Sequence, residues 1–376
     1  MKRYGRGALG EFLEDRVVYR NLTPVDPRLP ALSGLRESLG LAAGITPRKS
    51  TSGYAKVIAE ILKVARKIGS PKTQIERVLF IGDTLLNDST AFRNICRAGN
   101  WPGLAFIGSE NQEPPVSKVE ELEGVAVVHA NRWAALDEFE GHLSRKRFRV
   151  DEGTAVLLDL DKTTLGARGR NDQVINQARV EAAFATVDGL LGADFDPQGF
   201  EKAYHHLNQT VYHPFTTDNQ DYLVYMGLMI SAGLYDLEEL SNDIHSGQLA
   251  NFEQFIQRVD GHAGQMRAGL KEVHQDVSTR VRQGDPTPFK AFRVQEYRAT
   301  VAHLGQMAAE TPMDQLLAEE IVLTQEVRKW ALAWQAQGAL LLGLSDKPDE
   351  ASIPSPSLAA QGYQPIHKIE TSIVGT

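Results

Sequence analysis

A short apolar run that ends in two aspartates constrains the fold of this chain more than any other stretch. Residues 155–158 read Ala-Val-Leu-Leu, and Asp159-Leu160-Asp161 follows directly. A bounded run of this kind is typical of a strand that is buried on both faces of a parallel sheet. Residues two apart on a strand point the same way, so Asp159 and Asp161 are expected side by side where the strand ends. Ligands of open α/β sheets bind there, although a plain polar turn is the alternative for a short acidic motif.

Two other apolar runs end in the same manner. Residues 78–81 read Val-Leu-Phe-Ile and are followed by Gly82-Asp83, with Asp88 a little further on. Residues 340–344 form a third run, which ends at Ser345. Each run therefore stops at a group that can hold a metal or a phosphate. Because parallel strands present their carboxyl ends at one edge of a sheet, the three stretches predict a single constellation.

This constellation resembles the motifs of the haloacid dehalogenase superfamily, whose members are mostly phosphatases. The segment 159–163, Asp-Leu-Asp-Lys-Thr, is similar to the first motif of that family, DxDxT. Ser345 after its apolar run resembles the second motif. Gly82-Asp83 together with Asp88 resembles the fourth motif in its longer-spaced form.

The third motif of the family is a lone lysine, for which Lys49 is the best match and Lys56 the alternative. The motifs then occur in the order third, fourth, first, second, whereas the family usually runs from first to fourth. The resemblance therefore implies a circularly permuted core, in which the usual C-terminal half comes first. It covers roughly residues 40–165 and 336–376.

The region between the first and second motifs, residues 173–337, has an almost entirely helical pattern without strand–helix alternation. Its last part predicts one amphipathic helix from about residue 313 to Trp334, ended by Gly338. The expected fold class is α/β: a Rossmann-like core with a central parallel sheet in residues 1–169 and 338–376, and a helical domain in 170–337. In the family an insertion at this point is a cap over the active site; a helical bundle that serves assembly is the alternative.

The rest of the core is predicted from periodicity. Apolar spacing predicts a helix over 53–68, and further helices are expected near 88–98, with Gly99 as the cap, and from about 132 to 143. Two more buried strands are expected at 104–107 and 125–128. Residues 1–40 show no clear secondary-structure pattern, and the sequence does not indicate their role.

Composition narrows the functional classes. The formal charge is −8, which does not favour a nucleic-acid partner, because nucleic-acid binders carry a basic footprint. No stretch approaches about 18 uninterrupted apolar residues, so no membrane span is expected.

Cys96 is the only cysteine, which leaves no intrachain disulfide. The N-terminus lacks the apolar core of a signal peptide, so a cytoplasmic location is the default expectation. A homo-oligomer is an open possibility.

The predicted crowding of acids calls for a counter-charge. Two like charges about 4 Å apart repel by roughly 4 kcal/mol at an effective dielectric near 20, so several carboxylates would not all stay ionised. A hard divalent cation with oxygen ligands removes this repulsion, and Mg²⁺ is the usual ion where a substrate phosphate completes the shell. The resemblance implies that Asp159, the backbone carbonyl of Asp161, and the acids Asp83 and Asp88 hold this ion.

The resemblance also implies catalytic roles. Asp159 would attack phosphorus and form an aspartyl-phosphate, and Asp161 would act as general acid and then general base. Ser345 and Lys49 would hold the phosphoryl oxygens, and Thr163 would brace the turn. The dehalogenases of the family lack an acid at the position of Asp161, so its presence favours phosphoryl transfer.

Thr163 and three arginines are candidate substrate contacts. Arg168 and Arg170 lie in a glycine-rich loop directly after the first motif. Arg293 lies in the loop 284–293 of the helical region, which could meet an anionic substrate or could simply connect two helices. The expected function is a Mg²⁺-dependent phosphomonoesterase that acts on a small phosphorylated molecule. The alternatives are a phosphomutase or phosphotransferase with the same intermediate, and a non-catalytic binding or assembly protein on the same fold.

Overall fold

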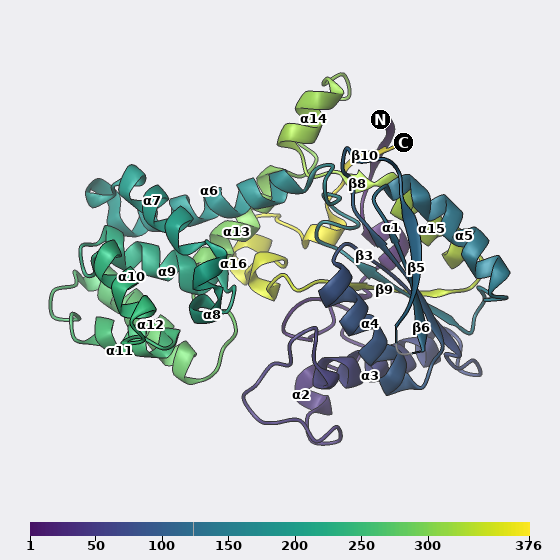
Figure 1. The fold of residues 1–376 in the computed structure, drawn as a ribbon, viewed down its shortest axis with the longest axis horizontal. Coiled ribbons are helices and arrows are strands. Elements are labelled where there is room, and N and C mark those ends of the chain that lie inside the picture. Colours follow the sequence, from purple (N-terminus) through teal and green to yellow (C-terminus); the bar gives the residue numbers. More distant parts are fainter. Residues whose placement is uncertain (123) are drawn as a thin grey trace. The chain divides into compact units, whose positions relative to one another are not determined.

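The computed structural model describes residues 1–122 and 124–376, and these residues form two compact units. One unit consists of Met1–Gln177 and Thr300–Thr376 and contains every described strand; the other, Ala178–Ala299, is helical (Figure 1). Both boundaries fall inside helices, in α6 (Asp172–Leu191) and α13 (Lys290–Ala302). The helical unit is thus shorter at both ends than the expected segment 170–337, because residues 300–337 belong to the unit with the sheets.

The main sheet has seven strands, and all neighbouring pairs are parallel except one. Only β5, at one edge, runs antiparallel to its neighbour β6. The predicted α/β class with a mostly parallel sheet is confirmed. In spatial order the strands are β2 (Val17–Val18), β9 (Leu340–Leu344), β7 (Thr154–Asp159), β3 (Arg77–Gly82), β4 (Gly103–Gly108), β6 (Val125–Ala130) and β5 (Ser117–Leu122).

Strands β7 and β9 are neighbours although most of the chain's second half separates them. They pair in parallel, from Ala155 opposite Leu340 to Asp159 opposite Leu344. This adjacency was expected from the two apolar runs, since both are apolar throughout, as central strands are. It places Ser345 next to the end of β7, where the two aspartates of the first motif lie.

Helices cover both faces of this sheet (Figure 1). Helices α3 (Ser52–Gly69) and α4 (Leu85–Gly99) lie on one face, and α1 (Gly10–Leu13), α5 (Leu136–Arg145) and α15 (Gln325–Ala336) lie on the other. Alternate strand residues point to opposite faces. Phe80 of β3 packs on Phe92 of α4 with ring centroids 5.7 Å apart, and Phe106 of β4 packs on Phe139 of α5 at 5.8 Å.

Helix α3 begins one residue before its predicted start, and α4 begins at Leu85, three residues before its predicted start near residue 88. The side chain of Thr51 caps α3 by accepting from the amide of Tyr54, and the apolar positions of α3 are buried against the sheet. Helix α4 starts directly after the acids of β3. Its C-cap is Asn100, in the left-handed conformation, rather than the predicted Gly99.

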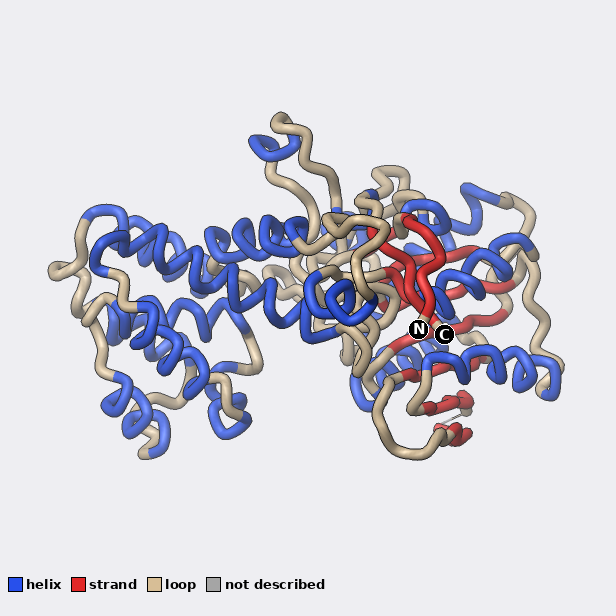
Figure 2. Tube along the Cα trace, turned by 90° about the horizontal axis from the view of Figure 1, so that it is seen from above, coloured by secondary structure: helices blue, strands red, loops and turns tan. Residues whose placement is uncertain are grey.

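A second, three-stranded sheet was not predicted. It consists of β1 (Lys2–Gly7), β10 (Thr371–Gly375) and β8 (Leu323–Thr324), in the order β1-β10-β8. Strands β1 and β10 are antiparallel, with Lys2 opposite Gly375, so the two ends of the chain lie side by side (Figure 2). Strand β8 has two residues, β1 is mostly charged or glycine, and β10 has an apolar run of only Ile373 and Val374, which leaves little apolar periodicity to detect.

The expected single helix up to Trp334 is wrong. The structure has α14 (Met313–Glu319) and α15, separated by an extended segment that includes β8. The carboxylate of Glu320 accepts from the amides of Met307 and Ser372 and from the hydroxyl of Thr371. Because Glu320 is buried, these tertiary hydrogen bonds outweigh the local helical pattern.

The helical unit has its own apolar core, which includes Phe200, Tyr225, Phe252 and Phe255. Its helices, besides parts of α6 and α13, are α7 (Pro197–Leu207), α8 (His213–Thr216), α9 (Gln220–Ser231), α10 (Leu237–His245), α11 (Phe252–Asp260) and α12 (Ala268–Arg282). The other unit also contains the short helices α2 (Leu32–Leu35) and α16 (Pro356–Ala359).

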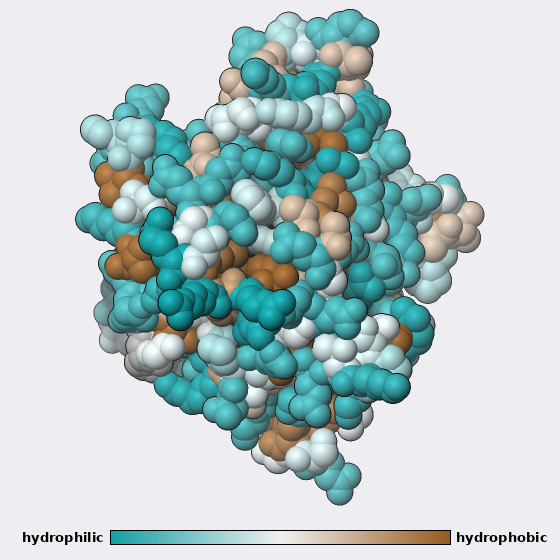
Figure 3. All heavy atoms as spheres, turned by 90° about the vertical axis from the view of Figure 1, so that its right-hand side faces the viewer, coloured by the Kyte–Doolittle hydropathy of each residue, from teal (hydrophilic) through white to brown (hydrophobic). Residues whose placement is uncertain are grey.

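No helix among the described residues is long and apolar enough to span a membrane. The face shown in Figure 3 is covered mainly by hydrophilic side chains, with apolar ones in small separate groups.

Candidate functional site

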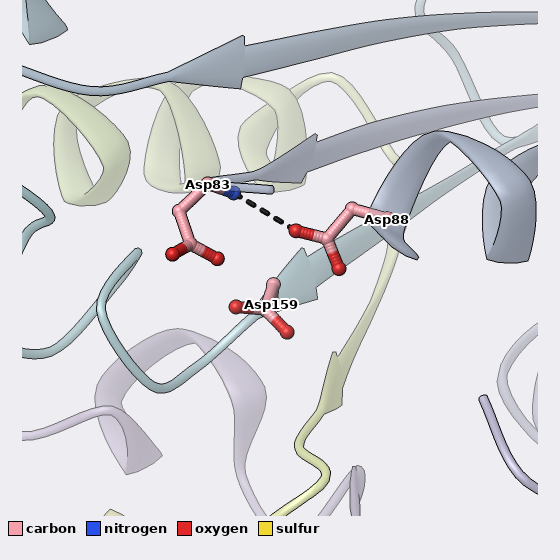
Figure 4. A group of neighbouring side chains, drawn as sticks. All are labelled: Asp83, Asp88 and Asp159. Atoms are coloured by element: carbon pink, nitrogen blue, oxygen red, sulfur yellow. Dashed lines mark hydrogen bonds between the residues drawn. The ribbon is translucent and has the colours of Figure 1, made fainter. Parts of the chain in front are cut away.

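Three aspartates converge at the carboxyl ends of β3 and β7. Asp83 directly follows β3, Asp159 ends β7, and Asp88 lies in the first turn of α4. One carboxylate oxygen of each lies within 4.8 Å of those of the other two, and Figure 4 shows the three side chains facing one another. The convergence follows from the parallel pairing of β3 with β7, which brings both strand ends to the same edge.

The turn between β3 and α4 fixes the orientation of Asp88. Its Oδ2 accepts hydrogen bonds from the amides of Asp83 (3.0 Å) and Thr84 (2.9 Å). A Cβ atom at Gly82 would lie 2.6 Å from that oxygen, so glycine is required there. The other oxygen of Asp88 is thereby turned towards Asp159.

Lys49 is the lysine that the structure brings to the aspartates. Its Nζ donates to Oδ1 of Asp88 at 2.6 Å and to Oδ1 of Asp159 at 2.5 Å. Lys49 is buried, whereas Lys56 lies on the exposed side of α3. Of the two lysines that resemble the third motif, only Lys49 therefore lies in the site.

The turn after β7 holds the carboxylate of Asp159 from the other side. Thr163 Oγ1 donates to Asp159 Oδ2 at 2.9 Å, and Thr164 Oγ1 donates to the main-chain oxygen of Asp159 at 2.6 Å. Both threonines are fully buried. Thr163 thus lies where a residue that braces the turn is expected, and Thr164, which was not singled out from the sequence, fixes the backbone beside it.

Asp161 and Ser345 form a second pair next to the three aspartates. Ser345 Oγ donates to Asp161 Oδ2 at 2.9 Å and accepts from the amide of Lys347 at 2.9 Å. The amide of Ser345 donates to Val18 of β2 at 3.0 Å. Asp161 is not one of the three converging carboxylates and is less buried than they are.

Arg168 reaches the site, and Arg170 does not. The Nε of Arg168 donates to Asp83 Oδ2, and this side chain is 40% exposed. The guanidinium of Arg170 is fully buried; it pairs with Glu326 at 2.9 and 3.0 Å and with Glu110 at 2.8 Å. In contrast to the expectation of a substrate contact, the guanidinium of Arg170 is paired with carboxylates in the protein interior and does not face the site.

Arg293 is likewise internal to the helical unit. It forms a buried ion pair with Asp221 and another with Glu296 at 2.5 Å. Burial opposes the charge of Arg293, but these two carboxylates outweigh burial and raise its pKa, so the guanidinium stays charged. A salt bridge between buried partners explains Arg293 without a substrate.

The environment of the three aspartates opposes the ionised form of two of them, Asp159 and Asp83. Burial raises the pKa of Asp159 well above its usual range, and the charges of Asp88 and Asp83 add to the effect against the attraction of Lys49. Burial and the neighbouring Asp88 also raise the pKa of Asp83.

Asp88 and Lys49 behave differently. Burial opposes the ionised form of Asp88, but Lys49 and the amides of Thr84 and Asp83 outweigh it and lower the pKa. Burial also opposes the charge of Lys49, but Asp159 and Asp88 raise its pKa, so it stays protonated. Among the residues that the structure describes, two cations, Lys49 and Arg168, pair with the three carboxylates. A further positive charge would stabilise the ionised form of these carboxylates.

The donor set fits a hard divalent cation. It consists only of carboxylate oxygens. Mg²⁺ and Ca²⁺ prefer oxygen ligands, whereas zinc sites typically use nitrogen and sulfur ligands. Opposite oxygens around Mg²⁺ are about 4.0–4.2 Å apart, and around Ca²⁺ about 4.6–5.2 Å. The three oxygens lie within 4.8 Å of one another, a bound that falls inside the Ca²⁺ span and somewhat beyond the Mg²⁺ span. Small side-chain shifts would therefore let Asp83, Asp88 and Asp159 share one ion.

No protein-family model matches the chain, and neither a curated protein nor a solved structure matches it significantly.

Proposed function

We propose that this protein is a Mg²⁺-dependent phosphomonoesterase that acts on a small phosphorylated molecule through a phosphorylated Asp159. The observation that carries this proposal is the convergence of Asp83, Asp88 and Asp159 with Lys49 at one edge of a parallel sheet. The motifs that resemble the haloacid dehalogenase superfamily supply these residues. The adjacency of β7 and β9 supports a permuted form of that fold.

In the first step, a carboxylate oxygen of Asp159 attacks phosphorus, and the bond between phosphorus and the leaving oxygen breaks. Asp161 in its protonated form gives a proton to that oxygen. Asp161 suits this role because it lies two residues from the nucleophile and outside the group of three carboxylates. Mg²⁺ held by the three aspartates supplies positive charge that offsets the charges of the carboxylates and the phosphoryl group.

In the second step, a water molecule attacks phosphorus, Asp161 takes its proton, and the bond to Asp159 breaks, which releases inorganic phosphate. The Ser345 hydroxyl, which donates to Asp161 in the structure, and the Lys49 ammonium are the donors for phosphoryl oxygens. Thr163 keeps Asp159 oriented in both steps through its 2.9 Å hydrogen bond. Such preorganised donors stabilise the transition state without reorganisation.

The test is hydrolysis of an aryl phosphate and of a panel of sugar, nucleotide and cofactor phosphates, with Mg²⁺ and with a chelator. Hydrolysis should require Mg²⁺, and Asp159→Asn should abolish it. Asp161→Asn should slow it by roughly 10²–10⁴-fold, the usual contribution of general acid–base catalysis. Asp137→Asn, at an exposed position of α5, is the matched control and should retain full activity. Full activity of the Asp159 variant would refute the proposed intermediate.

A further inference from the structure

The ion pair between Arg168 and Asp83 places a positive charge on a carboxylate that the candidate cation would need. Arg168 Nε donates to Oδ2 of Asp83, and its Nη2 lies 3.5 Å from Thr84 Oγ1. The Asp83 side chain is only 6% exposed, whereas that of Arg168 is 40% exposed. Arg168 can therefore leave the pair for solvent or a ligand, and Asp83 cannot.

The backbone around Arg168 is held firmly, so its side chain starts from a fixed point. The amide of Arg168 donates to the carbonyl of Lys162 at 2.6 Å. Its own carbonyl accepts from the amide of Glu110 at 3.0 Å and from Nε1 of Trp133 at 3.2 Å. Gly169 has φ +77°, and a Cβ there would lie 1.8 Å from the carbonyl oxygen of Glu110. This close approach requires glycine and anchors the loop.

We infer that Arg168 competes with the divalent cation for Asp83 and that the released guanidinium then binds the phosphoryl group of the substrate. This inference rests on the proposed function, which assigns the cation to the three aspartates. Without a cation, Arg168 and Lys49 together offset part of the charge of the three carboxylates. When a cation takes Asp83, the like charge of the ion repels the guanidinium.

The competition couples the two binding events. A cation that binds Asp83 must first break the Arg168–Asp83 pair, which costs free energy. Arg168 therefore weakens the affinity of the protein for the cation. A released guanidinium presents a planar fork of donors that matches phosphate oxygens, so Arg168 strengthens phosphate binding to the cation-loaded protein. A residue that only stabilises the fold would not produce this pair of opposite effects together.

The experiment uses the full chain with Arg168→Gln, and Mn²⁺ and inorganic phosphate as probes. Mn²⁺ affinity is measured by electron paramagnetic resonance of the free ion, and phosphate affinity of the Mn²⁺-loaded protein by calorimetry. Arg168→Gln should bind Mn²⁺ at least about fivefold more tightly and phosphate at least about fivefold more weakly, the lower end of ordinary coupling between two sites.

Arg77→Gln is the matched control. Arg77 pairs with Asp151 at 2.8 Å at the opposite end of β3, so its loss changes the net charge equally without touching the site. It should change neither affinity. If Arg168→Gln does not fold, Arg168→Lys replaces it, and both effects should keep their sign with smaller size, because lysine lacks the fork.

Unchanged or weaker Mn²⁺ binding in the folded Arg168 variant would overturn the inference, and so would unchanged phosphate binding. If the wild-type protein binds Mn²⁺ and hydrolyses an aryl phosphate while the Arg168 variant matches it, only the role of Arg168 fails. If the wild-type protein binds no Mn²⁺ and Asp159→Asn has no effect on hydrolysis, the proposed function fails as well.

Discussion

The ammonium of Lys49 lies 2.5 Å from Oδ1 of Asp159, although 110 residues separate the two in the chain. The same ammonium lies 2.6 Å from Oδ1 of Asp88. One buried lysine thus joins a residue from the end of β7 to a residue from the start of α4. This arrangement makes Lys49 the main internal counter-charge of the candidate metal site.

Replacing Lys49 should therefore cost both stability and activity. Lys49→Gln leaves Asp88 and Asp159 buried without their cation, and removing one partner of a buried pair destabilises by roughly 3–5 kcal/mol. Urea unfolding would measure this loss, and millimolar Mg²⁺ should restore part of it. Lys56→Gln, on the exposed side of the neighbouring helix α3, is the control and should change neither quantity. Equal effects of the two substitutions would contradict the central position of Lys49.

Most of the site was predictable because its residues follow buried apolar runs. The runs before Asp83, Asp159 and Ser345 are central strands, and central parallel strands have a simple sequence pattern. Parallel pairing then places their ends at one edge. The sequence therefore predicted that Asp83, Asp88 and Asp159 would meet. Asp161, which was expected side by side with Asp159, instead lies in the turn after the strand and accepts a hydrogen bond from Ser345.

Residues whose roles depend on tertiary contacts were not predictable in this way. Arg168 and Arg170 are two residues apart in one basic loop, yet one reaches Asp83 and the other pairs with Glu326 in the interior. Nothing local distinguishes them. Glu320 interrupts an apparently continuous helical pattern because its carboxylate is bonded to residues of other segments. Strand β8 was missed because it has two residues, and β1 because its residues are mostly charged or glycine. Strand β10 was missed because its apolar run consists only of Ile373 and Val374.

The buried pair of Arg170 and Glu326 should contribute to stability rather than to activity. Arg170→Met leaves Glu326 and Glu110 without their partner, and unfolding experiments should show a loss of roughly 3–5 kcal/mol. The double variant Arg170→Met with Glu326→Gln should recover part of this loss, because it removes the stranded charge. The control is Lys329→Gln, which breaks a pair whose two side chains are 50% and 54% exposed and should cost less than about 1 kcal/mol. Equal losses for both single variants would contradict the account of Arg170.

The stability of the protein should depend on pH through His367. This ring is fully buried, with Nε2 3.0 Å from Oδ1 of Asp15. Burial lowers the pKa of His367 below its usual range, although Asp15 favours the charged ring. The unfolded chain therefore binds a proton more readily than the folded one, so the contribution of His367 is complete above about pH 6.5 and is lost as the pH falls below that value.

Chemical unfolding at pH 7 and pH 5 tests this dependence. The free energy of unfolding of the wild-type protein should fall over this range by more than that of His367→Gln. His205→Gln, at a position that is 61% exposed, is the control and should behave like the wild type. An identical pH dependence of the wild type and His367→Gln would contradict the assignment.

Chemical trapping of the covalent intermediate tests the proposed function most directly. The protein is mixed with Mg²⁺ and an aryl phosphate, quenched in acid during turnover, digested and analysed by mass spectrometry, with Asp159→Asn treated in parallel. The proposed mechanism predicts a phosphoryl adduct on Asp159 that requires Mg²⁺, disappears with hydroxylamine and is absent from the variant. Turnover without any adduct on Asp159, or an adduct on another residue, would contradict it.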